Sequence, residues 1–508
     1  MAIGLEELLS RFWSCEEIGS STNYSPEELR CEEQFAQTVE RGSDGRYTVS
    51  LPKVEGALAK IERRLLKDVE LRQQYDQFIE EYLQLGHMRK VEARSLKQVT
   101  RCYLPHHPVV KQESTTTKVR VVFDASCKTA TGVSLNDVLT GPVVQEDLRS
   151  IILRSRTKQF MLVSDVEKMF RQIEINAADR PLQSILWRTD SSKKAETYEL
   201  TTVTYGTRPA PFLATRTLKQ LAMDERTHFP LAARDVEQDV YMDDVLTGVD
   251  NEETALNLRM QLEEMLQKGG FRLRKWASNC PSALQGMSED NLALIKTEGY
   301  QLDPDPAVRT LGLIWHPNTD VLKFRFKIPD LIEGETLTKR KVLSIHATLF
   351  DPLGLIGAVI TTAKVFMQLL WCLKDEKDNR LGWDHPLPMK VQGDWRYFHG
   401  QPLSLNELVI SRCVIRPKAV SLELHVFSDA FKRAYGACAY VRSIDTGANV
   451  SVALLTSKSK VAPLQCQSIP RLELCGARMA AELSNQVVEA IKMDVEMTFW
   501  TDSTCVLQ

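Results

Sequence analysis

Two adjacent aspartates, Asp243 and Asp244, lie inside a short apolar run. Val240–Met242 precedes them and Val245-Leu246 follows them. Burying one unpaired carboxylate costs free energy, and two neighbouring carboxylates also repel each other. A cation bound between them removes both penalties, and hard oxygen ligands suit Mg²⁺. Because successive side chains of a strand point to opposite faces, both aspartates can face one site only from the turn of a hairpin.

A third carboxylate lies upstream in a similar setting. Asp165 belongs to the apolar stretch Val163–Val166, and Phe170 stands five residues after it. Tyr205-Gly206 lies between Asp165 and the paired aspartates, and its glycine allows the backbone to approach a ligand closely. Taken alone, Phe170 is better explained as a core residue beside a capping aspartate, so the order of all these residues matters more than any one of them.

The elements that must hold these residues follow from apolar periodicity. Alternation predicts strands over residues 119–123 and 161–175. A helix is predicted from about residue 252 to 268, and Gly269-Gly270 ends it. The pattern then predicts a helix-rich block over 330–415, strands from Leu422 and a helix from Pro470.

In order and approximate spacing, Asp165, Gly206 and Asp243-Asp244 resemble the motifs of retroelement reverse transcriptases. The resemblance implies that Asp165, Asp243 and Asp244 are catalytic and hold two Mg²⁺ ions per active site, or Mn²⁺ in their place. It also implies that Phe170 stacks under the sugar and excludes a 2′-hydroxyl. Tyr205 and Gly206 would lie beside the incoming nucleotide.

The same resemblance assigns basic residues to the substrate. Residues 118–124 resemble the fingers hairpin that grips a deoxynucleoside triphosphate, a role given to Arg120 first and Lys118 second because arginine binds phosphate in a bidentate manner. Residues 270–276 resemble the next palm motif. Lys275 in this motif either donates a proton to pyrophosphate or is a surface lysine that contacts the backbone. An RNA or DNA template with its primer would be held mainly through phosphates.

Several longer motifs narrow the resemblance. Tyr103–Pro108, Val121–Ser126, Ser134–Asp137, Phe350–Leu355 and Pro470–Leu474 are similar to segments of the BEL/Pao class of LTR retrotransposons. The chain thus resembles part of a pol polyprotein.

Three further carboxylates occur in order near the C-terminus: Asp429 after a strand pattern, Glu473 at the start of a helix, and Asp502 after a later strand. Singly, Glu473 could complement a helix N-terminus and Asp502 could cap a helix. Together they resemble the two-metal site of ribonuclease H, which cuts the RNA of an RNA–DNA hybrid. Because the sequence stops at Gln508, before a fourth carboxylate and a last helix, we expect a truncated domain with little or no hydrolysis of its own.

Asp445-Thr446-Gly447 matches the catalytic triplet of retroviral aspartic peptidases. The triplet lies between two apolar strand patterns, and Asp and Gly are ordinary hairpin-turn residues. We therefore expect a turn, although a Pao retrotransposon peptidase label could attach to this region by homology. A non-catalytic nucleic-acid-binding relic or domesticated scaffold is the main alternative to an active polymerase, and a peptidase is a weaker one.

With 508 residues, 43% of them hydrophobic and 26% charged, the chain can form several domains with apolar cores. We predict an α+β multidomain protein with a right-hand polymerase of fingers, palm and thumb, a connection region and an incomplete α/β ribonuclease H-like domain. The expected parts are an N-terminal helical region (1–95), fingers and palm (96–325), a helical thumb and connection (326–418) and the truncated ribonuclease H-like domain (419–508).

The formal net charge of −3 does not mark a nucleic-acid binder, but a polymerase can be basic only along its groove. The eleven cysteines form no CxxC pair, which speaks against a zinc knuckle. Free thiols favour an intracellular protein, in a cytoplasmic particle or the nucleus, rather than a secreted one. The sequence has no run of about 18 apolar residues, so we expect no membrane partner. The sequence does not fix the oligomeric state.

Overall fold

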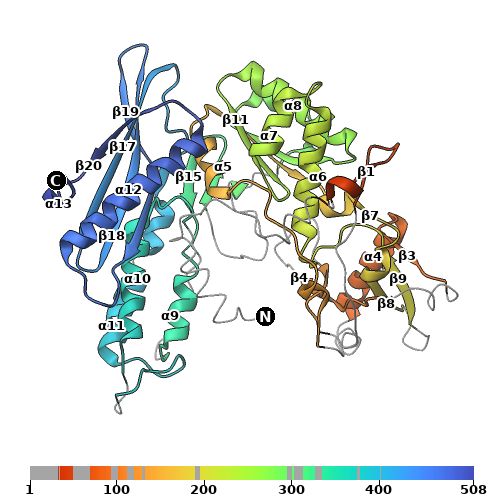
Figure 1. The fold of residues 1–508 in the computed structure, drawn as a ribbon, viewed down its shortest axis with the longest axis horizontal. Helices are drawn as coiled ribbons and strands as arrows, with labels where there is room; N and C mark the ends of the chain where they lie inside the picture. Colours follow the sequence, from red (N-terminus) through yellow and green to blue (C-terminus); the bar gives the residue numbers. More distant parts are fainter. Residues whose placement is uncertain are drawn as a thin grey trace.

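The computed structural model describes residues 33, 35–49, 69–92, 101–110, 119–128, 132–188, 195–293, 300–301, 313–326, 335–349, 351–374, 378–400 and 402–507. The predicted α+β multidomain class is confirmed, since separate sheets and helix groups follow one another along the chain (Figure 1). Lys118 lies outside the described residues, and so does the side chain of Arg120.

A four-stranded antiparallel sheet carries the first set of aspartates. Its order is β10 (Val240–Tyr241), β11 (Asp244–Val249), β6 (Phe160–Val166) and β12 (Leu273–Ser278). Its helices are α6 (Ala210–Glu225), α7 (Pro230–Gln238) and α8 (Glu252–Lys268). The predicted bounds of α8 are confirmed, and the Asn251 side chain caps it by accepting a hydrogen bond from the Thr254 backbone N–H. Apolar side chains of all three helices pack with Leu162 and Val245 in one core.

A second group of elements combines segments that precede β6 in the sequence with two strands that follow it. It contains α4 (Val69–Gln84), β3 (Met88–Lys90), β8 (Ser184–Trp187), β9 (Glu196–Leu200), and the hairpin of β4 (His106–Val110) and β5 (Val119–Phe123). The strand predicted over 119–123 is confirmed. His106 is buried in β4, where it contacts the Tyr75 hydroxyl and the Leu186 carbonyl. A small sheet joins β1 (Glu40–Arg41), β2 (Tyr47–Val49) and β7 (Glu174–Ile175).

The helix-rich block predicted over 330–415 contains α9 (Lys339–His346), α10 (Gly357–Trp371) and α11 (Met389–His399), which share a core around Trp395. One strand of this block, β16 (Val409–Ser411), joins the sheet of β13 (Tyr300–Gln301), β14 (Leu313–His316) and β15 (Val321–Phe324).

A second large sheet forms the C-terminal part, in the order β19 (Val450–Val461), β18 (Ala434–Asp445), β17 (Ala419–Phe431) and β20 (Glu496–Trp500). Only β20 runs parallel to its neighbour. The connection from β19 to β20 contains α12 (Ile469–Ile491), whose apolar side packs on β17 and β18, and α13 (Thr504–Leu507) follows β20.

The motif that begins at Phe350 links the helical block to this sheet. The Leu353 carbonyl accepts a hydrogen bond from the Ser457 backbone N–H of β19 at 2.9 Å. Asp351 is buried, and one of its carboxylate oxygens accepts from the Ile356 backbone N–H at 2.7 Å. The motif therefore has a structural role, because it attaches the helical block to β19.

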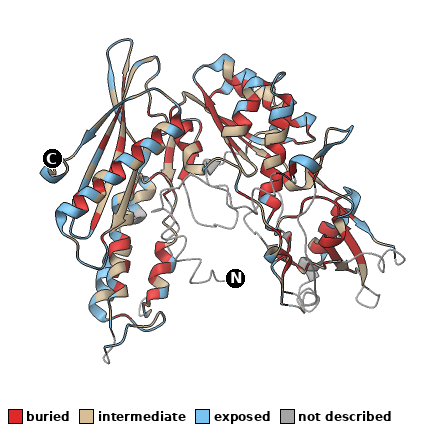
Figure 2. Ribbon diagram, viewed as in Figure 1, coloured by how far each residue is buried: buried red, intermediate tan, exposed pale blue. Residues whose placement is uncertain are grey.

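One short helix, α5 (Leu148–Ser155), stands between the aspartate-bearing sheet and α12 (Figure 1). Its residues Ile151–Leu153 belong to a buried apolar cluster that includes Val163 and Leu246 of one sheet and Leu424 and Val487 of the other part. The red buried stretches of the two parts meet there in Figure 2. Among the helices described, none is long and apolar enough to span a bilayer.

Candidate active sites

Asp243 occupies the turn of a tight hairpin, as the sequence predicts. Tyr241 pairs with Asp244 across β10 and β11, which leaves Met242 and Asp243 as a two-residue turn. Met242 has a φ of 54°, a conformation that favours glycine. Its backbone N–H donates to Gln145 Oε1 at 2.9 Å. Gln145 therefore helps to hold the turn, a role that no local sequence signal reveals.

Asp165 lies directly opposite Asp244 on the neighbouring strand β6. Side chains of directly opposed residues share one face of the sheet, with Cβ atoms about 4.5–5.5 Å apart. The backbone N–H of Val166 donates to the Asp243 carbonyl at 2.7 Å, which fixes the turn against β6. The fold thus brings Asp165 to the same end of the sheet as Asp243 and Asp244, which lie far from it in sequence.

Lys275 faces these carboxylates from the third strand. The pairing of β12 with β6 shifts register between Arg274 and Ala277, and Lys275 adopts a φ of 56° inside this bulge. Its Nζ lies 3.1 Å from Asp165 Oδ1, with half of the lysine side chain exposed. The bulge re-aims one side chain without disturbing the rest of the strand, so the ammonium group balances part of the charge of Asp165.

Tyr205 and Gly206 lie against the β4–β5 hairpin. The Tyr205 hydroxyl donates to the Val121 carbonyl at 2.6 Å. Gly206 has a φ of 98°, and a Cβ added there would stand 2.2 Å from the Phe123 carbonyl oxygen. The Asn136 side chain donates to the Gly206 carbonyl at 3.0 Å. In the sequence Asn136 is only part of a family motif, and no local signal reveals this contact.

Phe170 belongs to a short 3-10 helix, Met169–Gln172, directly after β6. It is partly buried and packs against the core of the aspartate-bearing sheet. Phe170 therefore contacts the core and also keeps part of its surface exposed.

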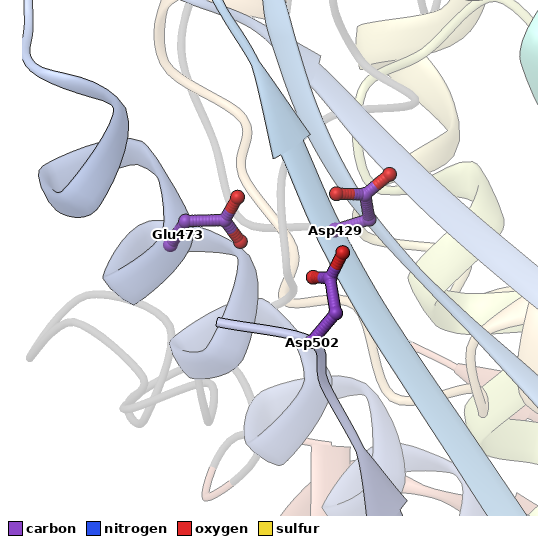
Figure 3. A group of neighbouring side chains, drawn as sticks. All are labelled: Asp429, Glu473 and Asp502. Carbon is purple, nitrogen blue, oxygen red and sulfur yellow. The ribbon is translucent and has the colours of Figure 1, made fainter. Parts of the chain in front are cut away.

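The C-terminal carboxylates form a compact group. Asp429 comes from β17, Glu473 from the first turns of α12, and Asp502 from the segment after β20. Oxygens of all three lie within 4.8 Å of one another, and the side chains point toward a common centre (Figure 3). Burial, followed by the charges of Asp429 and Asp502, raises the pKa of Glu473.

The donor chemistry of both groups fits a divalent metal ion, because each group has three carboxylates, whose oxygens are hard ligands. Among the described residues, only the C-terminal group has its three ligand atoms within 4.8 Å of one another; the hairpin group does not reach that spacing.

Asp445 is the last residue of β18, directly before the connection to β19. Its carboxylate accepts hydrogen bonds from the backbone N–H groups of Gly447 and Asn449 at 2.8 and 3.0 Å. The hydrogen bonds with Asn449 lead the contacts that lower the pKa of Asp445 to about 2. The predicted hairpin turn is confirmed.

Two family models match the chain. One describes a reverse transcriptase (RNA-dependent DNA polymerase) and matches residues 87–276. The other describes a Pao retrotransposon-like RNaseH-like domain and matches residues 338–503, which span the helical block and the C-terminal sheet. No curated protein matches.

Solved structures of a foamy viral protease-reverse transcriptase have a similar fold. One, described as a dRH form in complex with ds DNA, has a TM-score of 0.55 at 14% identity. The matched residues make up 99% of this chain and 76% of the foamy viral chain. Another, in complex with an RNA/DNA hybrid, has a TM-score of 0.51 at 13% identity, covering 99% of this chain and 58% of its own. At such identities the likeness shows the fold.

Proposed function

The chain contains a reverse transcriptase domain followed by a Pao retrotransposon-like RNaseH-like domain, and we propose that it copies RNA or DNA templates into DNA through two-metal nucleotidyl transfer at Asp165, Asp243 and Asp244. The observation that carries the proposal is the pairing of Asp165 on β6 with Asp244 on β11, with Asp243 in the turn that connects β10 to β11.

Mg²⁺, or Mn²⁺ in its place, would lower the pKa of the primer 3′-hydroxyl and neutralise charge on the triphosphate. Asp165 and Asp243 would hold one ion, and Asp244 would contribute to the other. Catalysis then depends mainly on positioning and charge stabilisation. Lys275, whose Nζ lies beside Asp165, would deliver a proton to pyrophosphate.

The nucleotide would lie between the aspartates and the β4–β5 hairpin. Gly206 supports this placement, because its missing side chain allows the loop to contact β5 closely. Arg120, in β5, and Lys118 before it would bind the triphosphate of a deoxynucleotide. Phe170, in the 3-10 helix that follows β6, would stack under the sugar.

Primer extension on an RNA template with Mg²⁺ and deoxynucleotides tests the proposal. We expect Asp243→Asn to lower the rate by about 10²–10³-fold or more, as removal of a transition-state contact does. Asp250→Asn is the control, because Asp250 follows the far end of β11 and pairs with Lys158 with 58% of its side chain exposed. Primer extension by Asp243→Asn at the wild-type rate would refute the mechanism.

A second candidate activity, metal-dependent cleavage of RNA in an RNA–DNA hybrid, is favoured by the close grouping of Asp429, Glu473 and Asp502. A hybrid with labelled RNA tests it. Cleavage that disappears in Glu473→Gln supports the assignment, and cleavage that persists in this variant removes it.

A further inference from the structure

Three arginines at α5 reach from the polymerase part into the RNase H-like part. Arg149 donates to Gln486 Oε1 at 3.1 Å and to Thr456 Oγ1 at 2.9 Å. Arg156 donates to the Leu455 carbonyl of β19 at 2.6 Å. Arg154 donates to the Ala490 carbonyl near the end of α12 at 2.9 Å. All three dock the two parts, but they differ in what else they touch.

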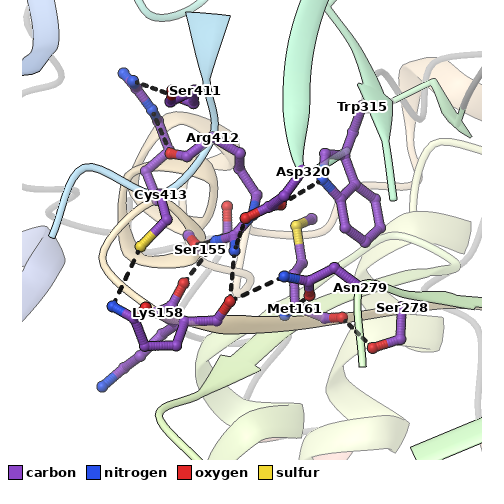
Figure 4. A network of polar contacts seen from close by, with 12 residues as sticks. Ser155, Lys158, Met161, Ser278, Asn279, Trp315, Asp320, Ser411, Arg412 and Cys413 are labelled. Atoms are coloured by element: carbon purple, nitrogen blue, oxygen red, sulfur yellow. Dashed lines mark hydrogen bonds and ion pairs between the residues drawn. The ribbon is translucent and has the colours of Figure 1, made fainter. Parts of the chain in front are cut away.

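Neighbouring contacts make this junction rigid. The Arg412 guanidinium, fully buried, uses its five N–H groups on two oxygens of Asp320 and on the carbonyls of Ser155, Lys158 and Gln159 (Figure 4). Because every donor is satisfied, the turn after α5 is held in one position. Arg156 adds hydrogen bonds to the carbonyls of Ser411 and Arg412.

Arg154 also touches the base of the aspartate hairpin. Its Nε lies 2.8 Å from Asp239 Oδ1, and an Nη2–H donates to the Gln238 carbonyl. Both partners directly precede β10, which leads into the Met242-Asp243 turn. The Arg154 and Asp239 side chains are 9% and 13% exposed, so solvent screens this ion pair little.

Asp239 directly precedes β10 and also binds β11, the second strand of the hairpin. Its carbonyl accepts from the Leu246 backbone N–H at 2.9 Å. The Thr247 hydroxyl lies 3.1 Å from Asp239 Oδ2 and 2.6 Å from Asp235 Oδ2. Leu246 and Thr247 belong to β11, the strand that Asp244 begins. A shift of Asp239 is therefore passed to both strands that present the aspartates.

We infer that Arg154 is a positioning residue for the polymerase centre, and that through its bond to α12 the RNase H-like domain helps to set where the aspartate hairpin lies. The inference rests on the proposed polymerase function. It gives the second domain a role in synthesis that needs no cleavage of RNA.

Arg154→Met and Arg149→Met form a matched pair of variants in the full chain. Both remove a hydrogen bond between α5 and α12, and Arg154→Met also removes the ion pair with Asp239 at the hairpin base. For Arg154→Met we expect the kcat of primer extension to fall about 10- to 100-fold, since misplaced catalytic groups lose rates of this size. We expect the Mg²⁺ concentration at half-maximal rate to rise about tenfold, as when groups that orient metal ligands are removed. The KM for the deoxynucleotide should change little.

Arg154→Lys distinguishes bridging from charge. A lysine still pairs with Asp239, so no buried carboxylate is left without a cation, but it cannot span to Gln238 and Ala490 at the same time. We expect this variant to fold and to show the same shift in Mg²⁺ dependence. It also decides the matter if Arg154→Met does not fold.

Each outcome decides one of the two claims. If the wild type extends no primer, the proposed function fails. If the wild type extends primers and both Arg154 variants keep the Mg²⁺ dependence and kcat of Arg149→Met, the function stands and the positioning role is wrong. A shift confined to the Arg154 variants supports it.

Discussion

Non-glycine residues with positive φ gather around the hairpin aspartates. Met242 precedes Asp243, and Lys275 faces Asp165, with φ values of 54° and 56°. Such conformations cost free energy and persist where the surrounding structure enforces them, often at functional sites. Here the Gln145 contact and the β12 bulge enforce them. The strain is the cost of aiming a carboxylate and an ammonium group at one place.

Gly206→Ala should impair the nucleotide site. The new Cβ would lie 2.2 Å from the Phe123 carbonyl oxygen, so β5 or the loop must move, at a cost of about 1–3 kcal/mol. We expect a lower unfolding temperature and a higher KM for deoxynucleotides. Gly132→Ala is the control, because Gly132 also has a positive φ, of 82°, but nothing within 4 Å. Equal effects of both changes would contradict the steric explanation.

Asp351 should make stability depend on pH. Burial raises its pKa from 3.8 to about 6. A carboxyl group with a raised pKa binds its proton more tightly in the folded state, so its stabilising contribution is present below pH 3.8 and is lost as the pH rises through 6. Between these values the wild type should lose about 2–3 kcal/mol more than Asp351→Asn, measured by urea unfolding. Parallel pH profiles of the two proteins would rule this out.

At the scale of elements, each carboxylate group proposed to bind metal is assembled from separate pieces of chain. A strand, a helix start and the segment after a parallel strand supply Asp429, Glu473 and Asp502. β6, the β10–β11 turn and the start of β11 supply the other group, and a bulge in β12 faces it. Neither group exists without its sheet, so metal binding should report on folding of each part.

Asp429→Asn should have opposite effects with and without metal. Without metal it removes one of the charges that raise the pKa of Glu473, so thermal unfolding should occur at a higher temperature. With Mn²⁺ the wild type should gain more stability, up to about 2.7 kcal/mol at a concentration 100 times Kd. Asp494→Asn, an exposed change between α12 and β20, should behave as wild type. An undiminished Mn²⁺ response of Asp429→Asn would exclude this group as a metal site.

Local patterns predicted the elements whose causes are local. The hairpin turn followed from two acids in an apolar run, and α8 from its periodicity and its terminal glycines. The approach of Lys275 to Asp165 could not be predicted, because it depends on a register shift between two strands. Arg154 gave no signal either, since its partner Ala490 is 336 residues away. The roles proposed for the site residues remain predictions.

At the scale of the whole molecule, the polymerase and RNase H-like parts share a buried cluster. Val163 and Leu246, next to the hairpin aspartates, belong to the same cluster as Leu424 and Val487. Parts with a common apolar core lose it together, so their unfolding is coupled. The C-terminal part is therefore a structural support for the palm as well as a second candidate site.

Calorimetry of Arg412→Met tests this coupling. In the wild type we expect the two parts to unfold in one transition. The variant leaves Asp320 without its buried partner and should lose about 3–5 kcal/mol, and the transition should broaden or divide. Two well-separated transitions already present in the wild type would show that the parts fold independently.

The central claim is that Asp165, Asp243 and Asp244 form a metal-dependent polymerase centre. Its most direct test is the single-turnover addition of one deoxynucleotide to a primer on an RNA template, with wild type and Asp165→Asn at equal folded concentration. We predict rapid, Mg²⁺-dependent addition by the wild type. For Asp165→Asn we predict a rate that is lower by about 10²–10³-fold or more. Addition by Asp165→Asn at the wild-type rate would contradict it.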